Sequence, residues 1–322
     1  MAASSNKVFP LLRPCLFLLF ALLLPSIQSN PVKNPFGFIK NLEGCHKGQT
    51  VKGLQDLKHY LEKFGYLNYK QETNKGNKRV MKNHANDDEF DDLLESAIKT
   101  YQRRYHLKVT GGLDADTANQ MMKPRCGVAD INVVNNGTNR HNHHRKSIHT
   151  VGRYQFFRGS PKWPADQTHL RYHFLSDVQV PGTENLRSII SRAFQRWTQV
   201  SHFTFEEVAE SSVAEIEIGF HRTQALDRND EGFDGPLGTF AHAMLPPGGR
   251  FHYDADETWS GNPGPSELDL ESVAVHEIGH LLGLRHSEDP QAIMFAYFDY
   301  GITKRDLHRN DIQRIRALYG SA

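Results

Sequence analysis

The stretch "VAVHEIGHLLGLRHS", Val273–Ser287, places three histidines and one glutamate at a spacing suited to metal chemistry. His276 and His280 are four residues apart, so a helix would present both imidazoles on one face, one turn apart. Neutral imidazole is a good ligand for Zn²⁺. Gly283 can adopt the left-handed conformation that ends a helix, which would let His286 return as a third ligand. Three protein ligands leave a fourth position open, as in catalytic rather than structural zinc sites.

Glu277 directly follows the first of these histidines and could reach a water molecule at the open position without being a ligand. Zinc would lower the pKa of such a water and polarise a scissile carbonyl. Glu277 would then take the water proton and pass it to the leaving amine, acting first as base and then as acid. The alternative, a helix with three surface histidines, rarely produces so strict a spacing. The stretch therefore predicts zinc-dependent hydrolysis of peptide bonds.

The chain has 322 residues, a net charge of +1 and three cysteines. The length allows one large or two modest domains, and the near-zero charge argues against a nucleic-acid-binding protein. Residues 1–29 combine a charged start, the apolar run "CLFLLFALLLP" and a small, polar end. This pattern predicts a cleaved signal peptide and a secreted protein, because the run is too short to span a membrane comfortably. No other long apolar run follows, so no membrane span is expected.

Residues 30–130 are predicted to form a small all-helical unit. Apolar residues recur at helical spacing in residues 51–64 and 90–105, and a third short helix is expected after the Gly-Gly turn at 111–112. The polar residues 70–88 between the first two helices are typical of a loop.

Residues 131–150 show no apolar periodicity and are predicted to be a linker and activation region that a protease can reach. Asn136 begins an Asn-Gly-Thr sequon, which is a glycosylation site in a secreted chain. His141, His143 and His144 could bind a metal, but a solvated tether is the simpler interpretation.

Residues 151–322 are predicted to form an α+β domain. Alternating apolar residues predict strands at 168–175 and 213–220, and helical spacing at 183–200 predicts a helix between them. The Gly- and Asp-rich stretch that follows is expected to be irregular. The helix that carries His276 and a last helix near 311–320 complete the domain.

The extended pattern His-Glu-x-x-His-x-x-Gly-x-x-His, from His276 to His286, resembles the zinc-binding motif of the metzincin metalloproteases. Ser287 after the third histidine is the variant typical of the matrix metalloproteinases, or matrixins, and Met294 lies where their Met-turn runs beneath the zinc. The sequence is most similar to plant matrixins, which lack a hemopexin domain. This resemblance implies a metzincin-like catalytic domain, a twisted mixed sheet plus helices, behind a small all-helical prodomain.

Cys126 in "PRCGVAD" resembles the cysteine switch of the matrixins. A thiolate is a good fourth zinc ligand, and by displacing water it would keep the proenzyme inert. The resemblance implies that Arg125 and Asp130 form a salt bridge that shapes this loop, although Ala129 replaces the usual proline. Cys45 is expected to be a free, partly buried thiol, since a disulfide to Cys126 would abolish the lock.

Further metal sites are implied by the segment from "FDGPLGTFAHA" to "FHYDADETW". The resemblance implies a calcium site built from three carboxylates and three backbone carbonyls: Asp234, Asp254 and Glu257 with Gly235, Leu237 and Thr239. A solvated acidic loop is the alternative.

His242 and His252 match two of the family's four structural-zinc ligands, but the usual His-Gly-Asp triplet is missing. Asp227 or His221 could substitute, so the structural zinc is expected to be weak or absent.

Two departures from the family pattern concern the pocket and the mature N-terminus. Ala296 and Phe298 stand where the Met-turn segment usually has proline and tyrosine, which would alter the wall of the pocket for the residue after the scissile bond. Asn310 replaces the aspartate that normally pairs with the new N-terminal ammonium after activation, so the mature N-terminus would be held less firmly.

Taken together, the sequence predicts a secreted zinc endopeptidase of the extracellular space or apoplast, made as a latent zymogen. Its partners would be protein or peptide substrates and an activating protease. The alternative is a matrixin-like extracellular binding protein with weak or no proteolysis. The departures from the family pattern and the resemblance of the prodomain to peptidoglycan-binding modules favour this alternative. The intact residues at 276, 277, 280 and 286 favour the enzyme.

Overall fold

The computed structural model describes residues 33–69, 86–131, 150–151, 154–155, 161–175, 179–222 and 232–321. The predicted signal peptide, the sequon at Asn136, the histidines at 141, 143 and 144, and Asp227 lie outside these ranges. Among the helices that the structure describes, none combines the length and the apolar character needed to cross a bilayer.

The N-terminal unit, residues 33–131, is helical and has an apolar core of its own. It contains the 3₁₀ helix η1 (Gly37–Leu42) and the helices α1 (Leu54–Lys63), α2 (Asp92–Arg104) and α3 (Ala115–Met121). The side chain of Asp91 accepts a hydrogen bond from the backbone N–H of Leu94 at 2.7 Å, which caps the start of α2. The three predicted helices are confirmed, whereas η1 was not predicted because its six residues are too few to show a period.

The C-terminal domain, residues 161–321, combines a sheet with three helices. Its elements are β4 (His169–Phe174), α4 (Leu186–Thr198), β5 (Thr204–Glu207), β6 (Ile216–His221), β7 (Thr239–Ala243), β8 (Arg250–Asp254), β9 (Trp259–Ser260), β10 (Leu268–Asp269), α5 (Leu270–Leu281) and α6 (Arg309–Tyr319). A short antiparallel pair, β2 (Thr150–Val151) with β3 (Tyr154–Gln155), precedes it. The α+β class is therefore as predicted.

The main sheet has the order β1-β7-β8-β6-β4-β5, where β1 (Arg125–Cys126) comes from the N-terminal unit. All neighbours are parallel except β7 and β8, which are antiparallel with His242 opposite His252. The prediction of an irregular stretch between β6 and α5 was wrong for β7 and β8. Each is only five residues long and lies in the Gly- and Asp-rich stretch. β7 shows no clear alternation, and the polar–apolar alternation of β8 covers too few residues to stand out there.

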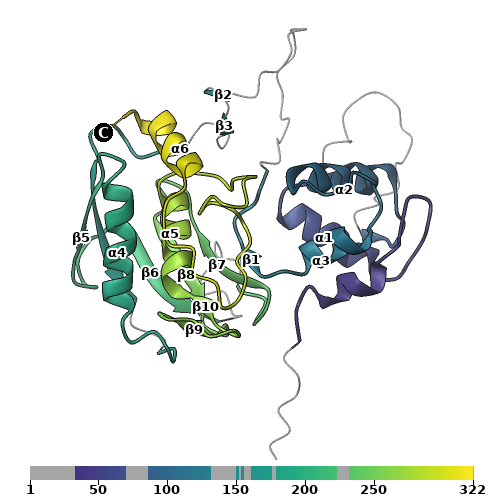
Figure 1. Ribbon diagram of the computed structural model, residues 1–322, viewed down its shortest axis with the longest axis horizontal. Coiled ribbons are helices and arrows are strands. Elements are labelled where there is room, and N and C mark those ends of the chain that lie inside the picture. Colours follow the sequence, from purple (N-terminus) through teal and green to yellow (C-terminus); the bar gives the residue numbers. More distant parts are fainter. Residues whose placement is uncertain are drawn as a thin grey trace, which may run out of the picture. The chain divides into compact units, whose positions relative to one another are not determined.

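Helices α4 and α5 pack against each other on one face of this sheet (Figure 1). Every residue of α5 is buried, and its N-terminus is capped by the side chain of Asp269. The indole N–H of Trp197 on α4 donates to the carbonyl of Val275 at 2.9 Å. Gly283 has φ +88° and its N–H donates to the carbonyl of His280, so it ends α5 as predicted. These contacts hold α5 against α4, and α5 also contacts β7 and β8 of the sheet.

Candidate metal centre and the segment beside it

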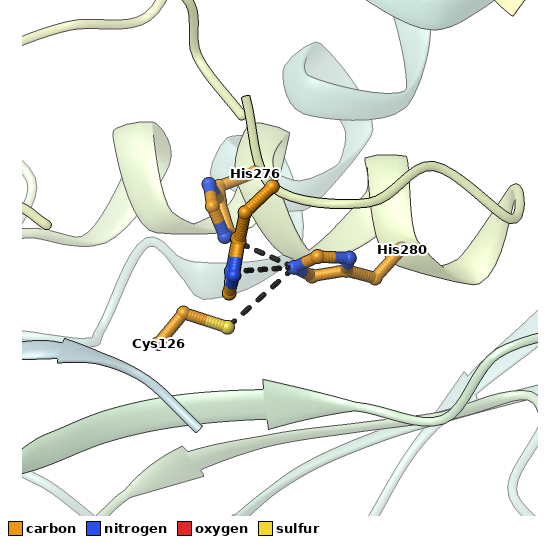
Figure 2. Close-up of side chains that lie close together, drawn as sticks. Cys126, His276 and His280 are labelled. Atoms are coloured by element: carbon orange, nitrogen blue, oxygen red, sulfur yellow. Dashed lines mark hydrogen bonds between the residues drawn. The ribbon is translucent and has the colours of Figure 1, made fainter. Parts of the chain in front are cut away.

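The three histidines of the motif and Cys126 form one buried cluster. Their ligand atoms all lie within 4.8 Å of one another. The Nε2 atom of His280 lies 3.1 Å from Nε2 of His276 and 3.1 Å from Nε2 of His286, and 3.6 Å from the sulfur of Cys126. Figure 2 shows the sulfur of Cys126 and the ring of His276 both directed at the ring of His280. In the part of the chain that the structure describes, no other group of three or more His, Cys, Asp or Glu side chains is close enough to share an ion in this way.

The other ring nitrogen of each histidine fixes which tautomer is present. Nδ1 of His276 donates to the carbonyl of Ile293 and Nδ1 of His280 donates to the carbonyl of Leu284, both at 2.7 Å. Nδ1 of His286 lies 2.7 Å from a carboxylate oxygen of Asp130. Because each acceptor takes a proton from Nδ1, the three Nε2 atoms present lone pairs to a common point.

Burial keeps these histidines neutral. It lowers the pKa of His276 and His280 well below the usual range, with the neighbouring imidazoles adding to the effect. Burial also lowers the pKa of His286 to about 4, against the opposing effect of Asp130. Three converging lone pairs on uncharged rings repel one another unless a cation lies between them, and Zn²⁺ takes neutral nitrogen ligands in this arrangement. The donor set therefore fits zinc.

Cys126 and Glu277 are both fully buried beside this cluster. Burial raises the pKa of the Cys126 thiol well above its usual range, and the charge of Glu277 adds to this. Burial also raises the pKa of Glu277 to about 8, which the adjacent thiol partly offsets. Neither carboxylate oxygen of Glu277 has a hydrogen-bond partner among the described residues. A divalent cation would reverse these directions, because it stabilises a thiolate and a carboxylate.

Met294 lies directly beneath the histidine helix. A Cβ added to Gly279, between the two helical histidines, would stand 2.3 Å from the sulfur of Met294, so only glycine leaves room for that side chain. The buried carboxylate of Asp311 accepts from the backbone N–H groups of Ile293, at 2.9 Å, and Met294, at 3.2 Å. The turn below the cluster is thus held by Asp311, a residue that the sequence analysis did not single out.

The segment that carries Cys126 lies between β7 and the chain that follows Met294. The backbone N–H of Arg125 donates to Gly238 at 2.9 Å, that of Gly127 to Ala241 at 2.8 Å, and that of Cys126 to Ala296 at 2.9 Å. Backbone pairing on both sides gives the segment one position and directs the thiol at the histidines.

A buried ion pair shapes the loop around Cys126. Nη2 of Arg125 lies 2.8 Å from a carboxylate oxygen of Asp130, and both side chains are fully buried. Burial alone would raise the pKa of Asp130, but the charge of Arg125 and the hydrogen bond from His286 hold it well below its usual range. The salt bridge implied by the family resemblance is therefore present, although Ala129 replaces the proline.

Tyrosines that the sequence analysis missed surround this ion pair. The hydroxyls of Tyr66 and Tyr105 donate to Asp130 at 2.7 and 2.9 Å. The hydroxyl of Tyr297 accepts from Nη1 of Arg125 at 3.2 Å and lies 2.6 Å from that of Tyr101. No spacing rule links residues so far apart in sequence, so only their aromatic, amphipathic character hinted at a role.

The predicted calcium residues lie around the loop before β7. Gly235 and Leu237 have positive φ values, +85° and +72°. The oxygens of Asp234 accept from the backbone N–H and hydroxyl of Thr239 at 2.8 and 3.0 Å, and Glu257 accepts from the N–H of Leu237 at 2.7 Å. Asp254 is fully buried, its Oδ2 has no hydrogen-bond partner among the described residues, and burial raises its pKa to about 7. A carboxylate in that setting is suited to a cation, but the carboxylates of Asp234, Asp254 and Glu257 do not lie close enough together in the structure to share one, so the calcium site stays a prediction.

Three histidines of the uncertain second zinc site lie on neighbouring strands. The rings of His221 and His252 stack with centroids 3.8 Å apart, and the rings of His242 and His252 are 5.4 Å apart. Parallel stacking does not aim two ring nitrogens at one point. The structure thus brings these histidines together without forming a shared ligand set among the described residues, and Asp227 lies outside those residues.

The remaining sequence predictions have simple outcomes. Cys45 is a free thiol, as predicted, and it is buried where partial burial was expected. Ala296 and Phe298 are buried, and the ring of Phe298 meets that of His276 edge to face, with centroids 5.3 Å apart, so Phe298 adjoins the cluster. Asn310 accepts a hydrogen bond from the hydroxyl of Ser287 at 3.1 Å.

Comparison with known proteins adds independent evidence. A family model described as Matrixin matches residues 162–320, and one described as Putative peptidoglycan binding domain matches residues 50–121. Metalloendoproteinase 2-MMP of Arabidopsis thaliana is 43% identical over 92% of this chain and 78% of its own length. Metalloendoproteinase 1 of Glycine max is 42% identical over 85% of this chain and 84% of its own length. Interstitial collagenase B of Mus musculus is 35% identical over 71% of this chain and 44% of its own length.

The buried His–Cys cluster and these similarities lead to the same conclusion: the chain belongs to the matrixin family of zinc metalloendopeptidases.

Proposed function

We propose that this protein is a secreted endopeptidase, made as a latent zymogen, that cleaves extracellular or cell-wall proteins. Residues 1–29 would be the signal peptide, 30–130 the prodomain, 131–150 the activation region and 151–322 the catalytic domain. The convergence of a thiol and three neutral imidazoles in one buried cluster is the observation that carries the proposal. In this account His276, His280 and His286 hold the zinc.

When bound there, zinc supplies Lewis-acid chemistry that polarises the scissile carbonyl and lowers the pKa of water. Glu277 is the base. Its carboxylate is fully buried beside the cluster, and the Cys126 thiol next to it would leave with the N-terminal unit, which would free the carboxylate to take a proton from water. It then delivers that proton to the leaving amine. The adjoining slot, which now holds the backbone of the Cys126 segment by pairing on two sides, would hold an extended substrate.

Cys126 keeps this machinery inactive. Its sulfur, 3.6 Å from Nε2 of His280, would exclude water from the open position, and its backbone would occupy the slot that a substrate needs. Cleavage in the linker would release the segment and open the site. The buried ion pair of Arg125 with Asp130 supports the lock by fixing the loop that carries the thiol.

Calcium and glycosylation belong to the same proposal. Asp234, Asp254 and Glu257, with the backbone carbonyls of Gly235, Leu237 and Thr239, would bind calcium next to β7 and so stabilise the edge of the slot. Asn136 would carry a glycan in the secreted chain.

Substitution of Glu277 tests the proposed chemistry. In protein activated by cleavage, Glu277→Gln preserves the shape of the side chain but removes the base, so the rate on a quenched peptide should fall by about 10²- to 10⁴-fold. Zinc content should stay at the wild-type value, because this residue is not a ligand. A zinc chelator should abolish the wild-type rate. Turnover close to that of the wild type in the zinc-loaded variant would refute the role of Glu277.

A further inference from the structure

The three histidines of the cluster differ in what orients them. His276 and His280 donate from Nδ1 to backbone carbonyls of their own domain, those of Ile293 and Leu284. His286 donates instead to the carboxylate of Asp130, which belongs to the N-terminal unit, at 2.7 Å. One of the three rings therefore depends on a residue that would leave after cleavage of the linker.

The carboxylate of Asp130 is fixed in place. Its Oδ1 accepts from Arg125 as well as from His286, and its Oδ2 accepts from the hydroxyls of Tyr66 and Tyr105. Its backbone N–H donates to the carbonyl of Phe64 at 3.1 Å. Four side-chain donors around one fully buried carboxylate leave it a single orientation.

The backbone beside His286 is also held by the N-terminal unit. Nη2 of Arg104 on α2 donates to the carbonyl of His286 at 2.9 Å. In the other direction, the side chain of Arg285 donates to the backbone carbonyl of Asp130. The N-terminal unit therefore positions both the ring and the main chain of His286.

We propose that Asp130 is a positioning residue of the zinc site, so that the N-terminal unit increases the zinc affinity of the uncut protein in addition to blocking it. This inference rests on the proposed assignment of His286 as a zinc ligand. A carboxylate on Nδ1 fixes the ring orientation, keeps Nε2 available and raises its basicity, and loss of such a partner typically costs about 10- to 100-fold in metal affinity. The prodomain therefore favours zinc loading before activation, and the activated enzyme holds its zinc less firmly.

Zinc affinity of full-length variants tests this directly. The background is the full-length protein with Cys126 intact, so the sulfur ligand is the same in every comparison. Adding Asp130→Asn should weaken zinc binding about 10- to 100-fold in a chelator competition. The matched control is Arg125→Met, which breaks the same buried ion pair but leaves the carboxylate on His286, and it should stay within about threefold of the background by the same argument.

A second measurement separates positioning from general damage to the interface. In the zinc-free background protein, the long-range ¹H–¹⁵N spectrum of His286 should show the Nδ1-protonated tautomer, whereas Asp130→Asn should give a mixture, since an amide can present either its oxygen or its nitrogen to the ring. Equal losses of zinc affinity in both variants would mean that docking, and not the carboxylate, matters, and would overturn the inference. Unchanged affinity in Asp130→Asn would overturn it as well. Failure of the proposed zinc site itself looks different: His276→Ala in the same background would then still bind zinc tightly.

Discussion

The hydroxyl of Tyr101, in the N-terminal unit, lies 2.6 Å from the hydroxyl of Tyr297, in the chain that follows Met294, and both side chains are buried. Tyr60 approaches the same Tyr297 hydroxyl at 3.3 Å, and Arg125 donates to it at 3.2 Å. These hydroxyls lie among aromatic rings where the N-terminal unit contacts the chain after Met294. Their hydrogen bonds favour one arrangement of the two surfaces, and the rings supply the buried apolar area. In the proposed zymogen, latency would therefore depend on this network as well as on the thiol.

Tyr101→Phe should loosen this contact. The change removes one buried hydrogen bond, about 1 kcal/mol, and so should increase the slow activity of the uncut protein several-fold. The activated enzyme should be unchanged, since cleavage separates Tyr101 from it. The matched control is Tyr69→Phe, whose hydroxyl donates to Asp91 within the N-terminal unit at 2.8 Å. An uncut Tyr101→Phe protein no more active than the Tyr69→Phe protein would show that the hydroxyl network does not contribute to latency.

The sequence was most informative where a site is local. Two histidines four residues apart and a glycine that ends their helix specify most of the cluster, because helix geometry alone brings them together. Cys126 was also found, but through family resemblance and not through its spacing. The contacts of Asp130 with His286 and of Tyr101 with Tyr297 join residues 156 and 196 positions apart, and no local rule predicts such pairs.

Strands were harder to predict than helices for a related reason. β7 and β8 are five residues long and lie in a Gly- and Asp-rich stretch, so neither gives a period as long as those that identify β4 and β6. The N-terminal helices, by contrast, each bury one face against a small core, which leaves a clear helical period in the sequence.

The second zinc site should be weak or absent. After dialysis against a mild chelator, the protein should retain about one tightly held zinc, because the stacked rings of His221 and His252 do not converge on one point. Metal analysis by mass spectrometry measures this. Two tightly held zincs would contradict the expectation, and His221→Ala and Asp227→Ala would then identify which residue completes the site.

Asp254 should make calcium binding depend on pH. Burial raises its pKa to about 7, above the value of about 3.9 expected in the unfolded chain, so the folded state binds more protons between these values. Without calcium, Asp254 therefore stabilises the fold most below pH 4. This contribution to the free energy of unfolding is at most about 4 kcal/mol, and it is lost as the pH rises to about 7. Calcium binds the ionised form, so its stabilising effect should grow over the same interval.

Melting temperatures between pH 5 and pH 8, with and without calcium, test this expectation. The wild type is compared with Asp254→Asn, whose side chain cannot titrate. This substitution should remove most of the pH dependence of stability without calcium and most of the pH dependence of the calcium effect. A calcium effect that is independent of pH in the wild type, or that survives unchanged in the variant, would exclude Asp254 as a calcium ligand.

The most direct test of the central claim is the activity of uncut Cys126→Ser protein. The sulfur lies among the three histidines, 3.6 Å from Nε2 of His280, and a neutral hydroxyl is a much poorer zinc ligand than a thiolate. The uncut variant should therefore cleave a quenched peptide faster than the uncut wild type. A thiol-reactive mercurial should activate the wild type but not the variant. If the folded, zinc-loaded, uncut variant is as inactive as the wild type, steric cover by the N-terminal unit, and not the thiolate, maintains latency.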